Sequence, residues 1–368
     1  MSAVQTSRRR GTLASIAAEL GVSRTTVSNA YNRPDQLSEE LRRRILDTAK
    51  RLGYPGPDPM ARGLRMRRVG AVGVLFTENL PFAFEDPASV EFLAGLAEEL
   101  GEMGDSMMVI PASSRYAAET DTYLIRQAVV DAFVVYSVAD DDPFLTAVRS
   151  RGLPMVICDQ PADVIDTAFV GIDDRQAIKP AVRHITELGH RRVGILSVRL
   201  SRVPNNGPVD KERLHNAHHQ VQRHRVEGAL EALAEAGIDP GTVPIIERHL
   251  NDRLNNREAA AELLESHPDL TAVVCTTDTQ ALAVLEYAAE KGIRVPEELS
   301  VTGFDGIERA RLLGLTTVEQ PNREKGRQVG KTLAAELAEE TRQQPRPPRV
   351  LLETKFCPGA TTAPPRQP

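Results

Sequence analysis

The chain has 368 residues, of which 41% are hydrophobic and 26% charged, a composition ordinary for a globular protein of two or three domains. Its cysteines are few and widely separated (Cys158, Cys275 and Cys357), which excludes a disulfide framework and a paired-thiol zinc motif. No apolar run reaches membrane-spanning length and the first residues lack a secretory signal, so we expect a cytoplasmic protein with no membrane partner.

Charge is distributed unevenly along the chain. Residues 1–68 contain fourteen Lys or Arg and six Asp or Glu, a net charge of +8 within a chain whose total is −6. The rest of the chain therefore carries −14. A basic segment on an acidic body is typical of a phosphate-binding module attached to a part that avoids nucleic acid. Residues 1–11 are expected to form a disordered basic tail.

Residues 12–32, TLASIAAELGVSRTTVSNAYN, predict two short helices joined by a tight turn. Apolar residues recur at helical spacing in the first helix: Ala14, Ala17, Ala18 and Leu20. Gly21 supplies the flexible residue that a sharp turn between helices needs. The alternative interpretation is a pair of core helices in an ordinary bundle.

The second helix, over residues 24–31, presents a polar face. It buries Val27 and Ala30 and follows Ser23, a good N-cap residue. The outer side chains are short or forked, as a helix needs to hydrogen-bond base edges in a major groove: Arg24, Thr25, Ser28 and Asn29. A third amphipathic helix, with a basic outer face, is predicted over residues 38–52.

Residues 55–68 are a link between this headpiece and the remainder. Pro57 and Pro59 make its start stiff, and Asp58 can cap a short helix over residues 59–65.

These segments resemble the lactose-repressor and galactose-repressor (LacI/GalR) family of bacterial transcription regulators. The headpiece likeness lies in TLASIAAELGVSRTTVSNAYN, LSEELRRRIL, LGY and MARGL, in that order. VGIDD, ELGHRRVGIL and the stretch from TAVVC to VEQP extend it to about residue 355. The resemblance implies a helix-turn-helix DNA-binding domain at 12–54, a hinge at 55–68 and an effector-binding and dimerisation domain at 69–360.

The resemblance also implies roles in DNA binding. In the family, paired hinge helices push a leucine between base steps of the minor groove, and Leu64 matches that leucine, although it could instead pack on the body. The implied base readers are Arg24, Thr25 and Asn29, and the implied phosphate contacts are Ser23, Thr26 and Ser28. Thr12, Asn32 and Arg62 complete the predicted DNA-binding set. Asn29 stands where many relatives have arginine and should therefore favour adenine over guanine.

From residue 69 onward, short β-branched runs alternate with longer amphipathic stretches, which predicts an α/β fold. The predicted strands are VGAVGVLF, SMMVI, AFVVY and PMVIC, followed by RRVGIL, VPII, TAVVC and LSVTGF. Two such series imply two doubly wound lobes. The resemblance implies a periplasmic-binding-protein-like body with three crossovers: lobe one at about 69–172 plus 314–340, and lobe two at about 173–313 plus 345–360, which includes residues 350–356.

Polar residues follow the predicted strands, where ligands of open α/β sheets bind. Asp159 follows PMVIC, Thr277 and Asp278 follow TAVVC, and Asp305 follows SVTGF. Carboxylates accept hydrogen bonds from adjacent hydroxyls, and a guanidinium supplies complementary donors. The family likeness makes Arg225, in R-x-x-G, and Asp305, in G-F-D, effector contacts. The alternatives are a structural ion pair for these two and an N-cap role, which we favour, for Asp278; for Asp159 both roles stay open.

The first lobe departs from the family pattern after its first strand. TENLPFAFEDPAS stands where relatives carry an Asn-Pro-aromatic-aromatic turn. Phe82 and Phe84 are the candidates for an apolar wall of the effector site, although loop aromatics often pack inward.

HNAHHQVQRH contains four of the eight histidines: His215, His218, His219 and His224. Imidazoles at this spacing suit zinc, but no carboxylate or cysteine spacing completes a known site. A solvated surface is the favoured interpretation, a loop lining the effector cleft the second, and a metal site the third. We expect no bound metal.

The sequence contains no G-x-S-x-G elbow, Walker loop, H-E-x-x-H or G-x-G-x-x-G after the first strand, so we expect neither enzyme activity nor a cofactor. The expected function is a repressor that binds double-stranded operator DNA as a homodimer and responds to a small-molecule effector, a sugar or nucleoside. The alternatives are a small-solute binding protein without a regulatory role and an α/β enzyme with a regulatory head.

Overall fold

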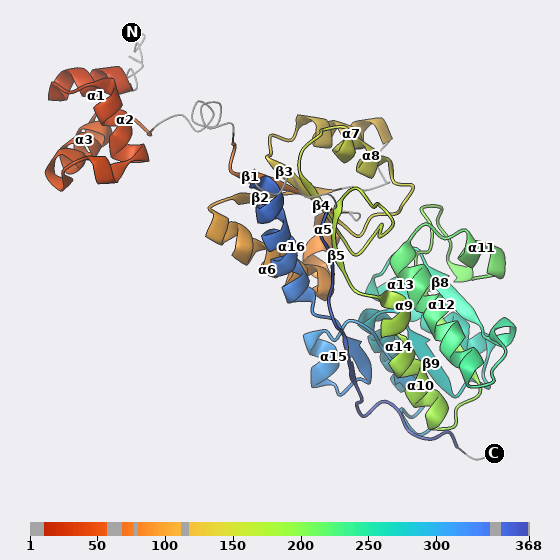
Figure 1. The fold of residues 1–368 in the computed structure, drawn as a ribbon. Helices are drawn as coiled ribbons and strands as arrows, with labels where there is room; N and C mark the ends of the chain where they lie inside the picture. Colours follow the sequence, from red (N-terminus) through yellow and green to blue (C-terminus); the bar gives the residue numbers. More distant parts are fainter. Residues whose placement is uncertain (1–10, 57–67, 77–79, 112–117, 339–346, 367–368) are drawn as a thin grey trace, which may run out of the picture. The chain divides into compact units, whose positions relative to one another are not determined.

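The computed structural model describes residues 11–56, 68–76, 80–111, 118–338 and 347–366. The chain divides into two compact units, Met1–Gly70 and Ala71–Pro368 (Figure 1). Arg62 and Leu64 lie outside the described residues. Among the helices that are described, none combines the length and the apolar run needed to cross a bilayer.

The N-terminal unit packs α1 (Leu13–Leu20), α2 (Arg24–Asn32) and α3 (Glu39–Arg51) around a small core. The buried apolar residues of this core are Ile16, Ala17, Val27, Ala30, Ile45 and Ala49. Ala18, predicted on the apolar face of α1, is exposed, and Ile16 is buried in its place. The reason is helical periodicity: residues 13, 16, 17 and 20 form one stripe, and position 18 lies outside it.

Local hydrogen bonds delimit these helices. Thr12 and Ser15 form a capping box at the start of α1, and Gly21 ends the helix with a left-handed φ of 65°. Ser23 caps α2 through a 3.0 Å hydrogen bond from the Thr26 backbone N–H, as predicted. Since each bond spans three or four residues, the helix-turn-helix pattern is specified by short segments of sequence.

The first lobe of the larger unit is a parallel sheet in the order β12-β5-β4-β3-β1-β2. Its strands are β1 (Ala71–Phe76), β2 (Ser106–Pro111), β3 (Ala132–Tyr136), β4 (Met155–Cys158), β5 (Ala168–Gly171) and β12 (Arg349–Leu351). Its helices are α5 (Leu80–Glu85), α6 (Pro87–Met103), α7 (Ala118–Gln127), α8 (Pro143–Arg149) and α16 (Asn322–Leu337). Apolar side chains of α7 and α8 cover one face of the sheet and those of α6 and α16 the other. This lobe is doubly wound.

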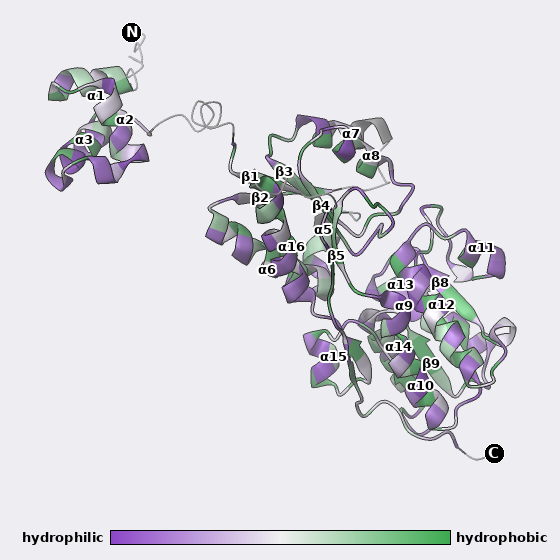
Figure 2. Cartoon of the chain, viewed as in Figure 1, coloured by the Kyte–Doolittle hydropathy of each residue, from purple (hydrophilic) through white to green (hydrophobic). Residues whose placement is uncertain are grey.

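The second lobe repeats the architecture with the strand order β10-β9-β6-β8-β7. Its strands are β6 (Val193–Val198), β7 (Gly207–Pro208), β8 (Ile245–Arg248), β9 (Ala272–Cys275) and β10 (Ser300–Thr302). Its helices are α9 (Asp174–Ala177), α10 (Lys179–Glu187), α11 (Lys211–His215), α12 (Gln220–Glu235), α13 (Arg253–Ser266), α14 (Asp278–Lys291) and α15 (Glu308–Leu312). In Figure 2 the helices show alternating green and purple stretches, as expected for helices with one apolar and one polar face.

Crossover segments link the lobes after β5, β10 and β12. β11 (Thr317–Glu319) and β13 (Lys355–Cys357) pair antiparallel within them. Residues 350–356 were predicted to lie in lobe two. This prediction was wrong for Val350 and Leu351, because they belong to β12, which pairs with β5 in the sheet of lobe one. β5 and β12 are three or four residues long and β12 begins with Arg349, so neither carries a strong strand pattern; pairing with neighbours makes them strands.

Glycines hold α16 close to α6 in the first lobe. A Cβ on Gly95 would lie 1.9 Å from the Arg323 carbonyl oxygen, and one on Gly326 would lie 2.1 Å from that of Phe92. Only glycine permits this approach. The N-terminal end of α16, which carries Asn322 and Lys325, is thereby held firmly.

Candidate functional site

Helix α2 presents the polar face that the sequence predicts. Arg24, Thr25 and Asn32 are exposed and Ser28 and Asn29 are partly buried, while the opposite face packs into the core. A helix with one polar face exposed in this way, followed by the basic helix α3, has the shape and charge that binding to a major groove needs.

Some predicted DNA contacts already have partners within the unit. The Ser23 and Thr26 hydroxyl oxygens lie 2.8 Å apart, and Ser23 also caps α2. Thr12 caps α1, and the Asn32 amide donates to the Ser28 hydroxyl at 3.1 Å. Any contact that these hydroxyl groups make with phosphate would therefore add to the hydrogen bonds that they already make within the headpiece.

Asn29 has a partner that the sequence interpretation missed. Its amide nitrogen donates to the Gln36 side-chain oxygen at 3.2 Å, and Gln36 lies in the short turn η1 (Pro34–Gln36). The amide nitrogen has two N–H groups, so the second N–H and the amide oxygen stay available for an adenine edge. The hydrogen bond to Gln36 thus fixes the orientation of the Asn29 amide within the headpiece.

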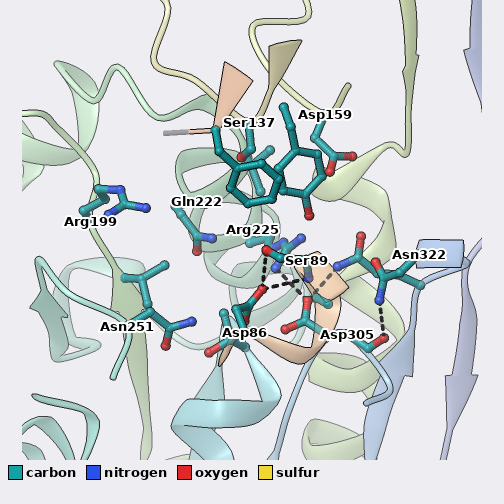
Figure 3. A pocket seen from close by; sticks show the side chains of 17 residues that line it. Asp86, Ser89, Ser137, Asp159, Arg199, Gln222, Arg225, Asn251, Asp305 and Asn322 are labelled. Atoms are coloured by element: carbon teal, nitrogen blue, oxygen red, sulfur yellow. Dashed lines mark hydrogen bonds and ion pairs between the residues drawn. The ribbon is translucent and has the colours of Figure 1, made fainter. Parts of the chain in front are cut away.

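A polar pocket lies between the lobes, where the carboxyl ends of strands from both sheets meet (Figure 3). It contains about 690 Å³ of empty space, part of which is open to solvent. Asp159, Arg225, Thr277 and Asp305, all predicted, line it. Asp159, Thr277 and Asp305 were predicted from the rule that ligands bind beyond strand ends, and Arg225 from the family likeness of its R-x-x-G motif.

Phe84 does not line the pocket. Phe84 is 63% exposed on α5, and the side chain of Phe82 is outside the description. The aromatic lining comes instead from Phe76 and Tyr136, whose ring centroids lie 4.7 Å apart at the ends of β1 and β3. Burial raises the pKa of Tyr136 well above its ordinary value, so the phenol is neutral. The signal that could have found both aromatics was their position as last residues of strands.

Arg225 lies in the floor of the pocket, 4% exposed. Its Nε donates to Asp174 at 2.8 Å, one terminal nitrogen donates to the Thr276 carbonyl oxygen at 2.8 Å, and that nitrogen lies 3.4 Å from Asp305. Its guanidinium lies 3.9 Å from the centroid of the Phe304 ring. Arg225 therefore belongs to a buried ion-pair cluster and faces the pocket as well, so the two interpretations do not exclude each other.

The backbone around Arg225 explains how it reaches Asp174. The helix α12 begins at Gln220, so Arg225 lies in its second turn. Gly228 follows three residues later, and a Cβ there would lie 2.2 Å from the Arg175 carbonyl oxygen. The glycine of R-x-x-G thus lets α9 approach α12 closely enough for the Arg225–Asp174 pair.

A second buried cation, Lys325, was missed by the sequence interpretation. It is 2% exposed and donates to Asp159 at 2.7 Å and to the Gln320 side-chain oxygen at 2.5 Å. Gln320 in turn donates to Asp305 at 2.6 Å. A continuous network, Asp159–Lys325–Gln320–Asp305–Arg225, therefore connects a strand end of lobe one to α12 of lobe two.

The network holds more carboxylates than cations. Asp159, Asp174 and Asp305 face Arg225 and Lys325, and Asp278 adds a further negative charge nearby. Burial and the neighbouring Asp278 raise the pKa of Asp305 to about 8, against the lowering effect of Arg225. The pocket floor therefore retains a proton near neutral pH.

Backbone strain is concentrated at this site. Among the residues described, the non-glycine residues with positive φ are Ser137 (54°), Asp159 (65°) and Asp305 (121°), and all of them line the pocket. Such conformations cost energy and persist where the surrounding structure holds them in place, typically at ligand sites.

The favoured N-cap role for Asp278 was wrong. The N-cap of α14 is Thr277, whose hydroxyl accepts from the Gln280 backbone N–H at 3.3 Å. Asp278 is fully buried and accepts from the Thr317 hydroxyl at 2.5 Å and the Ile307 backbone N–H at 2.9 Å. Burial raises its pKa to about 6. Asp278 therefore ties α14 to the crossover that carries Gln320.

The four histidines do not gather around one point. His215 is exposed at the end of α11 and His224 is partly buried on α12. His218 Nδ1 lies 2.6 Å from Asp140 in lobe one, and its ligand atoms with those of Asp140 and Asp141 lie within 4.8 Å of one another. His219 is buried against lobe one. The segment therefore joins the lobes, closest to the second of the three sequence interpretations.

Comparisons with known proteins match both parts of the chain. Residues 12–56 match the family model described as bacterial regulatory proteins, lacI family, and residues 182–362 match that of the periplasmic binding protein-like domain. The HTH-type transcriptional regulator IpsA of Corynebacterium glutamicum is 55% identical over 356 residues, which cover 96% of this chain and 98% of that protein.

Two solved structures extend the comparison. A complex of the transcriptional regulator CelR with cellobiose is 28% identical, with a TM-score of 0.67 and coverage of 96% of this chain and 100% of that one. The lac repressor dimer bound to operator and the anti-inducer ONPF is 20% identical, with a TM-score of 0.78 and the same coverage. At that identity the second likeness concerns the fold.

Proposed function

The chain belongs to the LacI family of bacterial regulatory proteins and is a transcriptional regulator with a helix-turn-helix DNA-binding domain; we propose that it is a repressor that binds a pseudo-palindromic operator as a homodimer. We propose in addition that a sugar or nucleoside binds the interlobe pocket and controls operator affinity. The observation that carries the proposal is an exposed polar helix α2 in the same chain as a pocket lined from both lobes. As expected, the relatives are regulators and not enzymes.

The proposed division of labour follows the chain. Residues 12–54 bind DNA, residues 55–68 form the hinge, and residues 69–360 bind effector and dimerise. In the hinge, whose residues 57–67 lie outside the described part of the chain, Arg62 contacts DNA and Leu64 wedges a central base step. An apolar wedge unstacks a step at a cost of about a few kcal/mol and bends the duplex onto more protein surface.

Sequence preference is assigned to α2. Arg24, Thr25 and Asn29 read base edges, and the hydroxyl groups of α2 and its cap hold phosphates. Asn29, with its amide oriented by Gln36, pairs with adenine through one donor and one acceptor. The remaining proposed contacts are Thr12, Ser23, Thr26, Ser28 and Asn32.

The pocket favours a polyhydroxylated effector. Its carboxylates and amides offer acceptors and donors that suit adjacent hydroxyl groups, and Phe76 and Tyr136 offer apolar ring faces for a sugar or base. Figure 3 shows Asp86, Arg225, Asp305 and Asn322 pointing toward one another in this pocket. The sugar complex of CelR, a relative, agrees with this chemistry.

Regulation is proposed as a population shift. Effector stabilises one arrangement of the lobes around Asp159, Arg225 and Asp305, the paired hinge helices lose their spacing, and the operator is released. Coupling of this kind requires that the effector bind the two arrangements with different affinity.

A gel-shift of the purified chain on its own upstream DNA, with and without a panel of sugars and nucleosides, tests the proposal. We expect a preference for that fragment over random duplex at physiological salt and a loss of the shift with one compound class. Equal binding to both duplexes would refute the regulatory function.

Asp305→Ala separates sensing from DNA binding. We expect unchanged operator affinity and no effector response, because Asp305 lies in the pocket and outside the DNA-binding unit. Asp166→Ala, at a surface carboxylate 63% exposed, is the matched control and should retain the response. Equal loss of DNA binding in Asp305→Ala would mean that the residue is structural only.

A further inference from the structure

The histidine-rich segment 217–221 joins the two lobes beside the pocket. Residues 217–219 precede α12 of lobe two, and residues 220–221 are the first residues of that helix. The segment contacts two loops of lobe one, residues 137–142 and 159–162. These loops follow β3 and β4 and contain the strained residues Ser137 and Asp159. The contact is therefore continuous with the pocket wall.

The N-terminus of α12 is capped by the other lobe. Within the described chain, His219 at the N-cap position makes no capping hydrogen bond through its side chain. The Val221 backbone N–H instead donates to the Gln160 side-chain oxygen of lobe one at 2.8 Å. Helix starts leave N–H groups without intrahelical partners, and these need an acceptor when buried. Gln160 is 2% exposed and supplies that acceptor across the lobes.

This one bond determines the orientation of the side chains around it. Because a backbone N–H can only donate, the Gln160 oxygen must be the acceptor and its amide nitrogen the donor. The amide nitrogen lies 3.1 Å from the Ser137 hydroxyl and 3.2 Å from His219 Nδ1. His219 Nδ1 must therefore be unprotonated. Burial lowers the pKa of His219 well below its ordinary value, which agrees with a neutral ring.

Gln220 makes the reciprocal contact. Its side-chain oxygen accepts from the Ala162 backbone N–H of lobe one at 2.8 Å. Beside it, His218 contacts Asp140 at 2.6 Å, and the Asp140 backbone N–H donates to the His218 carbonyl oxygen at 3.2 Å. Each lobe thus supplies hydrogen-bond partners to backbone groups of the other lobe. Water could take the place of these partners only after the lobes separate.

We propose that Gln160 and Gln220 form an interlobe clasp, and that Gln160 is a positioning residue that caps α12 only while the lobes keep this arrangement. Val221, Gln222 and Arg225, all in the first turns of α12, line the pocket. Separation of the lobes therefore removes the cap from the helix that presents these side chains. Lobe arrangement and pocket geometry then change together. The proposed effector response requires this coupling, and the regulatory meaning of the inference rests on that proposed function.

The test compares Gln160→Leu, which cannot accept a hydrogen bond, with Gln160→Glu, which keeps an acceptor oxygen. Hydrogen exchange is measured on the full chain without ligand. We expect exchange at residues 221–224 to rise about fivefold or more in Gln160→Leu, the range of a lost cap, and to return toward the native rate in Gln160→Glu. The last turns of α12 should not change in either variant. Gln220→Leu, which leaves the cap in place, should loosen the 159–162 loop first.

Spin labels on cysteines at Val129 in lobe one and Leu254 in lobe two, both exposed, report the arrangement of the lobes in a Cys357→Ser background. The distance distribution should broaden in Gln160→Leu and stay narrow in Gln160→Glu. A folded Gln160→Leu with native exchange at residues 221–224 and a native distance distribution would overturn the proposal.

Operator binding is measured separately on the upstream DNA fragment. If the native chain binds no such fragment, the proposed function fails while the exchange and distance results still decide the clasp. If the native chain binds, we expect Gln160→Leu to differ from it by at least about threefold in operator Kd, a free-energy change somewhat smaller than the usual value of one helix cap. Identical affinities in all variants would overturn the link to regulation.

Discussion

The two units of the molecule satisfy their polar side chains over very different distances along the chain. In the headpiece, the capping bonds of Ser15, Thr26 and Leu41 each span three residues. In the pocket, Arg225 binds residues 51 and 80 positions away, and Lys325 binds Asp159 166 positions away. Local bonds form wherever the helix forms, whereas the pocket network exists only when both lobes are folded and adjacent.

This difference predicts unequal costs for losing one polar group. A cap leaves a helix end that water can solvate, whereas a cation removed from a buried cluster leaves carboxylates without a partner. The experiments below test that contrast in order of expected effect.

Arg225→Met should have the largest effect. It leaves the Asp174 carboxylate buried without its cation and removes the guanidinium beside Asp305, and breaking a buried pair costs about 3–5 kcal/mol. Urea unfolding of the larger unit, followed by circular dichroism, measures the loss. Arg183→Met, in a pair whose partners are each 50% exposed, is the control and should cost about 0–1 kcal/mol. Similar losses in both variants would show that the buried network is not distinctive.

The pH dependence of stability should reveal the proton in the pocket floor. The folded-state pKa of Asp305, about 8, lies above its ordinary value, so the folded chain binds this proton more tightly than the unfolded chain. The stabilisation is complete at low pH and is lost as pH rises through about 8. Asp305→Asn mimics the protonated form. Its unfolding free energy relative to the native chain should therefore increase between pH 6 and pH 9, and a constant difference would contradict the assignment.

Ser23→Ala tests the headpiece side of the comparison. The loss of the hydrogen bond from the Thr26 backbone N–H should destabilise the headpiece by about 1 kcal/mol, the usual value of an N-cap. Hydrogen exchange of the amides in α2 measures the change, which should leave the larger unit unaffected because the units have separate cores. A loss as large as that of Arg225→Met would break the contrast between local and distant bonds.

Gln36→Ala should have the smallest effect, confined to specificity. Without the Gln36 oxygen, Asn29 must be ordered when it meets a base, which costs about 0.5 kcal/mol or slightly more. Competition gel-shifts with adenine or guanine at the contacted position should show a reduced preference for adenine. Unchanged discrimination, with normal folding of the variant, would mean that Gln36 does not orient Asn29.

Part of the candidate site could be predicted from the positions of the strand ends. Asp159, Thr277 and Asp305 were found because each follows a parallel strand, and such strands end at one edge of the sheet. Gln320 and Lys325 could not be found this way. Gln320 lies on a crossover, and Lys325 lies on α16, a helix whose position depends on its packing against α6. The N-cap of α14 was assigned to Asp278 in place of Thr277 for a related reason. Both can cap a helix, and only the packing of Thr317 against Asp278 decides between them.

The sequence by itself determined the helix-turn-helix headpiece, the alternating strands and helices of the body, and the strand ends that meet at the pocket. These features depend on periodicity and on bonds between residues a few positions apart. The tertiary structure alone decided that β12 joins the first sheet, that Phe76 and Tyr136 form the aromatic wall, and that the histidine-rich segment receives its helix cap from the other lobe. Each of these depends on a group brought close only by folding, and residue spacing along the chain carries no record of it.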